Sequence, residues 1–233
     1  MKYLSKKGID VSNVRVALQG FGNVGSYAGM YIEEAGAKVV AVEDHTGTIV
    51  NEAGIDMKAL MDYNKEHRCI KGFPGADAVE GSVITMDVDV LMPCALENQI
   101  TSANAGDVKA KIVCEGANGP TTPEADAILF ANGVTLVPDI LANSGGVTVS
   151  YFEWVQNLMR YNWTFEEVQD KQKALMVKAF EEIWSLAGEH GVDMRTAAYM
   201  MSIKRIADAM KLRGWYTETP VKQVEENKEE STV

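Results

Sequence analysis

The chain has 233 residues, of which 46% are hydrophobic and 24% are charged, a composition typical of a globular protein with a core of ordinary size. Its 33 acidic side chains outnumber the 22 basic ones, giving a net charge of −11, which argues against nucleic acid or an anionic membrane as a partner. No apolar run approaches the ~18 residues of a membrane helix, and the first residues do not read as a signal peptide. Cys69, Cys94 and Cys114 lack CxxC spacing, so we expect free thiols and a reducing, cytoplasmic location.

The first two-thirds of the chain alternates short apolar runs with helical segments. We expect strands at 14–19, 38–43, 89–93, 111–114 and 134–137, and helices at 23–35 and 56–67. Apolar runs without polar alternation, separated by helices, are typical of a parallel sheet covered on both faces. The pattern therefore predicts an α/β protein with a doubly wound, mostly parallel sheet.

Beyond about Pro138 the pattern becomes helical. Helices are expected at 139–159, from 164 to about 187, and from 193 to 214. The second of these opens with a capping box, in which Thr164 and Glu167 satisfy each other's terminal amides. We expect the folded domain to span 1–216. Residues 217–233, with five Glu against two Lys, read as a disordered acidic tail.

A glycine loop follows the first strand and opens the first helix. Its residues, Gly20-Phe21-Gly22-Asn23-Val24-Gly25, form the pattern GxGxxG in the context that dinucleotide binding requires. Gly20 permits the tight turn, Gly22 lets the backbone approach a pyrophosphate, and Gly25 lets the helix pack on the sheet. The helix N-terminus then offers amides to the phosphates. The alternative is a glycine-rich turn without a ligand.

Two acids stand at the end of the second strand. Glu43 lies 23 residues after Gly20, and Asp44 is next to it. A carboxylate at this place accepts hydrogen bonds from the adenosine ribose and repels a 2′-phosphate. With no arginine nearby in the sequence before Arg68, the pair favours NAD over NADP. The alternative is a solvated acidic turn.

Three later loops, 93–98, 115–123 and 138–146, follow strands and should share the ligand-binding edge of the sheet. In them, Asn118 and Asn143 have amides that suit a carboxamide such as nicotinamide, although turns and caps also favour asparagine. His45, His67 and His190 show no metal-ligand spacing. We predict no metal ligand in the chain, and the residue pattern alone indicates no catalytic acid or base.

These segments resemble the cofactor-binding domain of the glutamate, leucine, phenylalanine and valine dehydrogenase family. The matching segments, in order over about 1–216, are 19–25, 93–100, 115–126, 137–147, 150–154 and 210–215. The Pro-Thr-Thr-Pro loop at 120–123 and the Ser-x-Phe-Glu-Trp segment at 150–154 look like the glutamate branch. The resemblance implies a Rossmann-type fold and, in the full enzyme, oxidative deamination of L-glutamate to 2-oxoglutarate and ammonia.

The resemblance also assigns roles to individual residues. Asn23 would contact the cofactor phosphates, and Ala95, Asn118 and Asn143 would lie along the nicotinamide half. Val147 and Ser150 match positions that line the pocket for the substrate's side-chain carboxylate. They are one helical turn apart, so both can face one cleft.

Family members are homo-hexamers whose separate N-terminal domain carries the catalytic lysine and aspartate and most substrate contacts. That domain is absent from these 233 residues, so we expect the chain to bind NAD(H) without catalysing the reaction. Two alternatives stay open. One is a truncated, non-enzymatic dinucleotide-binding module. The other is a domain of a leucine, phenylalanine or valine dehydrogenase, against which Ser150 speaks, because an apolar substrate leaves a buried hydroxyl without a partner.

Overall fold

The computed structural model describes residues 9–215 and divides the chain into two compact units, Met1–Ala198 and Tyr199–Val233. The acidic tail expected at 217–233 lies outside the described residues.

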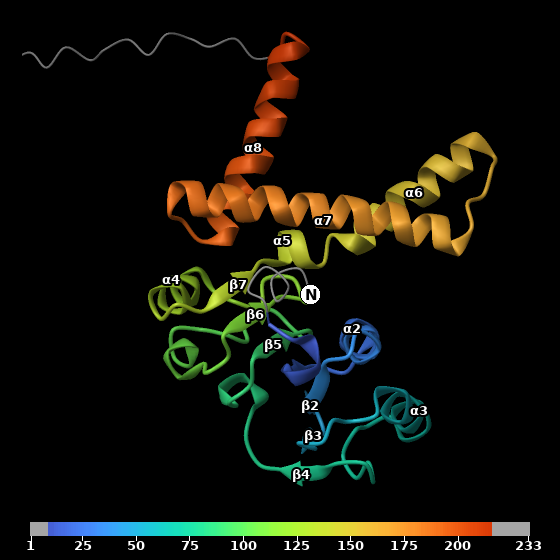
Figure 1. The fold of residues 1–233 in the computed structure, drawn as a ribbon, viewed down its shortest axis with the longest axis vertical. Coiled ribbons are helices and arrows are strands. Elements are labelled where there is room, and N and C mark those ends of the chain that lie inside the picture. Colours follow the sequence, from blue (N-terminus) through green and yellow to red (C-terminus); the bar gives the residue numbers. More distant parts are fainter. Residues whose placement is uncertain (1–8, 216–233) are drawn as a thin grey trace, which may run out of the picture. The chain divides into compact units, whose positions relative to one another are not determined.

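A seven-stranded sheet forms the centre of the first unit (Figure 1). Its strand order is β4-β3-β2-β1-β5-β6-β7. The strands are β1 (Arg15–Gln19), β2 (Lys38–Asp44), β3 (Gly47–Val50), β4 (Asp77–Val79), β5 (Val90–Pro93), β6 (Ile112–Cys114) and β7 (Thr135–Val137). Five neighbouring strands of this order are parallel, which confirms the prediction; they are β2, β1, β5, β6 and β7. The sequence did not reveal β3 and β4, which add to one edge as antiparallel strands. They are short, and β4 is exposed along its whole length, so it lacks an apolar run.

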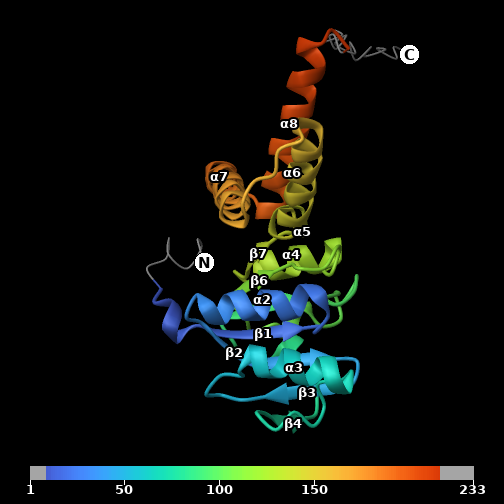
Figure 2. The ribbon, with the colours of Figure 1, turned by 90° about the vertical axis from the view of Figure 1, so that its right-hand side faces the viewer.

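Helices and short 3-10 turns cover both faces of the sheet. Helices α2 (Asn23–Glu34) and α3 (Met57–His67) pack side by side on one face (Figure 2). Helix α4 (Pro123–Ala131) and the 3-10 turns η2 (Val83–Thr85) and η3 (Ala105–Asp107) lie on the other face (Figure 1), and η1 (Val11–Asn13) precedes β1. The sheet is therefore doubly wound, as predicted. Its central strands place Leu18 and Leu91, both fully buried, between these layers.

The helical segment after β7 differs from the expectation at one point. The single helix expected over 139–159 is two helices, α5 (Asp139–Ala142) and α6 (Gly145–Met159). Between them Asn143 closes α5 and Ser144 opens α6. Glycine is a poor residue for a helix interior, so the pair Gly145-Gly146 favours a break here.

Helix α7 (Phe165–His190) begins with the predicted capping box and ends at His190, three residues later than expected, with Gly191 as its C-cap. The first residues of α8 (Met194–Leu212) belong to the first unit, and in the second unit α8 continues from Tyr199 to Leu212. Within residues 9–215, no helix is both long enough and apolar enough to cross a bilayer.

The capping box gives a direct stability test. Thr164 Oγ1 accepts the Glu167 amide at 3.2 Å, and Glu167 Oε2 accepts the Thr164 amide at 2.7 Å. We expect Thr164→Ala to lower the free energy of unfolding by ~1 kcal/mol, because it leaves a helix amide without an acceptor. Thr164→Ser keeps the hydroxyl and should stay near wild type. Urea unfolding measures both, and equal stability of the two variants would contradict the capping role.

Candidate functional site

The topology singles out the carboxyl end of β1. This strand has β2 on one side and β5 on the other. Helix α3, which comes after β2 in the chain, and the turn η3, which comes after β5, lie on opposite faces of the sheet. In such sheets a crevice opens at this switch point, outside the carboxyl ends of the strands. A cleft of about 1020 Å³ lies there. Its walls come from the end of β1, the glycine loop, the end of β2, helix α3 and the loop after β5.

Steric constraints fix the glycine loop. Gly20 has a φ of +101°, and a side-chain Cβ there would lie 2.7 Å from the Ala95 amide nitrogen. A Cβ on Gly25 would lie 2.0 Å from the Gly20 carbonyl oxygen. Gly20 is therefore required by the tight turn, and Gly25 is required by the close packing at the start of the helix, as the motif predicts.

Gly22 differs from the other two glycines because its surroundings are open. Its φ of −83° suits any residue, and among the described residues no atom lies within 4 Å of where its Cβ would be. Gly22 is the N-cap of α2, and within residues 9–215 no side chain caps that helix end. The first amides of α2 therefore face a space where a pyrophosphate fits. Asn23 lines the cleft at this point.

Two other loop residues have different surroundings. The Phe21 side chain is buried against the cleft wall. Val24 is half exposed and lines an adjoining recess.

Both predicted acids line the cleft at the end of β2. Glu43 Oε2 accepts hydrogen bonds from the Ser82 hydroxyl at 2.7 Å and the Val83 amide at 2.8 Å. Asp44 Oδ1 accepts the Thr46 amide at 2.7 Å and the Thr46 hydroxyl. In each carboxylate these hydrogen bonds use one oxygen. They hold the side chain in place, so the negative charge lies beside the cleft.

Two basic side chains share this wall. Lys65 and Arg68, near and at the end of α3, line the same cleft as Glu43 and Asp44. In the sequence Arg68 is remote from the acids, since it lies 24 residues beyond Asp44. Helix α3 returns along the sheet face and brings it to the cleft, a consequence of topology that sequence separation does not reveal.

A recess of about 650 Å³ continues the cleft along the strand ends. It shares Cys94, Ala95 and Leu96 with the cleft, and it adds Asn118 from the loop after β6. Asn143 Nδ2 donates a hydrogen bond of 2.7 Å to Asn118 Oδ1. The structure thus brings together three residues predicted for the nicotinamide half, Ala95, Asn118 and Asn143. Their loops are far apart in the sequence.

The recess also contains groups that could act as nucleophile or base. Burial raises the pKa of the Cys94 thiol to about 12, so it stays protonated near neutral pH. Glu97, which the sequence analysis passed over, also lines the recess, and its side chain is exposed to solvent. Among residues 9–215, no group of three or more His, Cys, Asp or Glu side chains could hold a metal ion.

Behind the recess lies an ion-pair cluster that the sequence analysis missed. We call it the Arg195 network, made of Arg195, Glu115, Asp126 and Asp139. Arg195 Nη2 donates to Glu115 at 2.7 Å, Nη1 donates to Asp139 at 2.9 Å, and Nε donates to Asp126 at 2.5 Å. Glu115 is fully buried and also accepts the Asp139 amide at 2.7 Å. No local motif marks these residues, because they lie on four separate elements.

Burial and charge pairing oppose each other in this network. Burial raises the pKa of the Glu115 carboxyl, and the adjoining Arg195 guanidinium offsets part of that rise. Burial likewise raises the pKa of Asp126, again against the pull of Arg195. The carboxylates in turn raise the pKa of Arg195, against its own burial, so the cation is permanent.

The two predicted substrate residues lie apart from the cleft lining. Val147 and Ser150 are both exposed on α6, and neither lines the cleft or the recess. The Ser150 hydroxyl donates to the Gly146 carbonyl of its own helix at 3.2 Å. To donate to a substrate carboxylate it would have to give up that bond.

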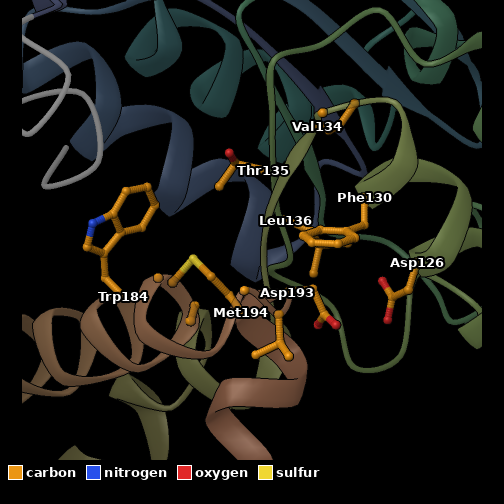
Figure 3. A pocket seen from close by; sticks show the side chains of 13 residues that line it. Asp126, Phe130, Val134, Thr135, Leu136, Trp184, Asp193 and Met194 are labelled. Atoms are coloured by element: carbon orange, nitrogen blue, oxygen red, sulfur yellow. The ribbon is translucent and has the colours of Figure 1, made fainter.

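A second cavity, of about 360 Å³, lies between α4, β7 and the end of α7 (Figure 3). Its walls are mostly apolar, with Phe130, Leu136 and Trp184 among them. Its carboxylates are already engaged, Asp126 by Arg195 and Asp193 by Thr196. It lacks the glycine loop that lines the larger cleft.

The switch-point cleft, the glycine loop and the acids after β2 define a Rossmann-type domain. The chain belongs to the Glutamate/Leucine/Phenylalanine/Valine dehydrogenase family, whose sequence profile matches residues 1–214.

Relatives and solved structures agree with this placement. The chain is 53% identical to the NAD-specific glutamate dehydrogenase of Clostridioides difficile over 91% of its own length and 52% of that protein. The crystal structure of glutamate dehydrogenase from Peptoniphilus asaccharolyticus is 44% identical, with a TM-score of 0.79 over 92% of this chain and 51% of that one. A hetero-hexameric glutamate dehydrogenase from Thermus thermophilus, in a leucine-bound form, is 30% identical, with a TM-score of 0.84 over 93% of this chain and 51% of that one. The chain thus spans about half the length of the relatives it matches.

Alanine substitution should have different effects at Gly25 and at Gly22. Gly25→Ala should destabilise the fold by ~3 kcal/mol or more, because its methyl group meets the Gly20 carbonyl oxygen. Elsewhere in a helix the same change stabilises by ~1 kcal/mol. Gly22→Ala should leave stability near wild type and weaken NADH binding at least about tenfold, because the methyl group occupies the phosphate space. Thermal unfolding and calorimetry measure the two effects. A Gly22→Ala variant that binds NADH normally would remove the pyrophosphate from this loop.

We expect cofactor choice to depend on the balance of charges at the end of β2. The double variant Glu43→Gln, Asp44→Asn keeps side-chain size and hydrogen-bond acceptors but removes both charges. We expect the ratio of NADP to NAD dissociation constants to fall by about tenfold, since Lys65 and Arg68 then face the 2′-phosphate without competing acids. Titration of both cofactors at neutral pH measures the ratio. An unchanged ratio would show that the acids do not set the preference.

Proposed function

We propose that this chain is the cofactor-binding part of an NAD-dependent L-glutamate dehydrogenase. The observation that carries the proposal is the continuous groove formed by the cleft and the recess. It runs from Glu43 and Asp44 past the open face of Gly22 to Asn118. That order matches the order of ribose, pyrophosphate and nicotinamide in an extended dinucleotide. Relatives named NAD-specific glutamate dehydrogenases support the choice of NAD.

In this proposal the chain's own residues bind and orient the cofactor. The first amides of α2 hold the pyrophosphate, and the acids after β2 accept the adenosine ribose hydroxyls. The hydrogen bond from Asn143 to Asn118 leaves amide donors and acceptors for the nicotinamide carboxamide. The bound NAD supplies the hydride acceptor. The chain fixes which face of it is open to a substrate.

We propose Val147 and Ser150 on α6 as contacts of the substrate's side-chain carboxylate. Both are exposed and lie one helical turn apart, so one ligand can reach both. A hydroxyl that donates to a carboxylate favours glutamate over an apolar amino acid.

We further propose that the acid/base groups come from a second domain outside these 233 residues. Two observations support this: the chain spans about half the length of the relatives it matches, and the recess offers amides, a protonated thiol and a single carboxylate, Glu97, which is exposed to solvent. A positioned acid or base contributes about 10²–10⁴-fold to such reactions.

The test is binding and turnover on the same sample. We expect calorimetry to show that the chain binds NADH, and we expect glutamate-dependent NADH formation to stay at background. A separately produced N-terminal half of a full-length relative, added to the chain, should raise the rate if the halves dock. Absence of NADH binding at millimolar concentration would overturn the cofactor role.

Turnover by the chain alone, near the roughly 1–10³ per second of ordinary enzymes, would contradict the second-domain proposal. Glu97 is then the first residue to test, because it is a carboxylate on the recess wall. Glu97→Gln would have to abolish that activity.

A further inference from the structure

We propose that Arg195 is a positioning residue for the nicotinamide end of the cofactor, through the asparagine pair Asn118 and Asn143. The inference rests on the proposed cofactor binding and assigns a role in it to a residue outside the cleft. Arg195 lines neither the cleft nor the recess. Its influence has to pass through the carboxylates that it holds.

The guanidinium joins three separate elements with one rigid group. Its Nη2 holds Glu115 at the end of β6, Nη1 holds Asp139 at the start of α5, and Nε holds Asp126 on α4. A planar fork can make these contacts at once because its donors point in fixed directions. A lysine has a single nitrogen at this place and cannot span the three carboxylates.

One arm of the network leads directly to the asparagine pair. Asp139 accepts Arg195 on Oδ1 and the Gly119 amide, at 2.8 Å, on Oδ2. Gly119 follows Asn118 in the chain, so the Asp139 carboxylate fixes the loop that carries Asn118. Asp139 also begins α5, and Asn143 closes that helix one turn later. The same carboxylate therefore fixes both partners of the 2.7 Å hydrogen bond between Asn143 and Asn118.

Electrostatics explains why this arm depends on the cation. Glu115, Asp126 and Asp139 converge on Arg195, and Glu115 has no exposed surface. Without the guanidinium the carboxylates would repel one another, and Glu115 would be a buried charge without its cationic partner. The loop after β6 and the start of α5 would then move apart or lose charge. Either change disturbs the asparagine pair.

The adenosine end of the groove should not share this dependence. The glycine loop and the acids lie on β1, α2 and β2, which contribute none of the four side chains of the Arg195 network. Close backbone contact holds Gly20 and Gly25 there. Loss of the network should therefore weaken the nicotinamide contacts selectively.

The experiment compares two ligands that differ only in the nicotinamide. NADH carries it and ADP-ribose lacks it, so the ratio of their affinities isolates the nicotinamide half. For the full chain, we expect Arg195→Lys to weaken NADH about five- to tenfold. ADP-ribose binding should change less than about twofold. The fluorescence of bound NADH, which reports the nicotinamide's surroundings, should shift toward that of the free cofactor.

Three further variants separate positioning from general stability. Asp139→Asn cuts the arm that leads to Asn118 and should reproduce the selective loss of NADH. Asp126→Asn removes an equal charge from the same network on the α4 side and should leave the affinity ratio unchanged. Arg15→Lys is the matched control outside the network, because Arg15 pairs with Glu52 in an exposed ion pair before the start of the groove.

Each outcome decides the proposal. Selective loss of NADH in Arg195→Lys and Asp139→Asn, with unchanged ratios in the two controls, supports it. If Arg195→Lys does not fold, Asp139→Asn alone decides by the same criterion. An unchanged ratio in Asp139→Asn overturns the proposal, and so does an equal effect in Asp126→Asn. A wild-type chain that binds neither ligand refutes the proposed function, and this inference with it.

Discussion

The start of helix α2 lies so close to the end of strand β1 that no side chain fits between them at Gly25. This steric constraint determines where the helix begins and which way its first amides point. Because Gly22 faces open space in the same turn, the positive end of the helix remains accessible. The cleft, the acids after β2 and the recess all take their places relative to this turn, since β1 is the strand between β2 and β5.

The two ends of the groove are held by different physical means. Around Gly20 and Gly25 the restraint is steric, because Gly25 packs against the Gly20 carbonyl of the same turn and Gly20 packs against Ala95 in the loop after β5. At Asn118 and Asn143 it is electrostatic and long-range, because four charged side chains from β6, α4, α5 and α8 converge. A permanently charged guanidinium suits this role, since burial does not remove its proton near neutral pH. The network costs desolvation, and its gain is the fixed geometry of loops that have no strand to hold them.

Much of the parallel sheet and the groove could be predicted from the sequence, because apolar strands and the GxGxxG turn are local signals. The capping box at Thr164 was also predicted and is confirmed. Strands β3 and β4 were missed, since β3 is only four residues long and β4 is an exposed edge strand without an apolar pattern. The positions of Arg68 and Arg195 could not be predicted either, because they depend on how distant segments return to the sheet. The roles given to the site residues, including Val147 and Ser150, remain predictions.

We propose that the dinucleotide lies along the groove that starts at the glycine loop. Backbone amide chemical shifts, followed by NMR while NADH is added, test this most directly. We expect the largest changes on Gly22, Asn23, Asp44, Ala95 and Asn118. Changes confined to the second cavity, at Phe130, Leu136 and Trp184, would contradict it.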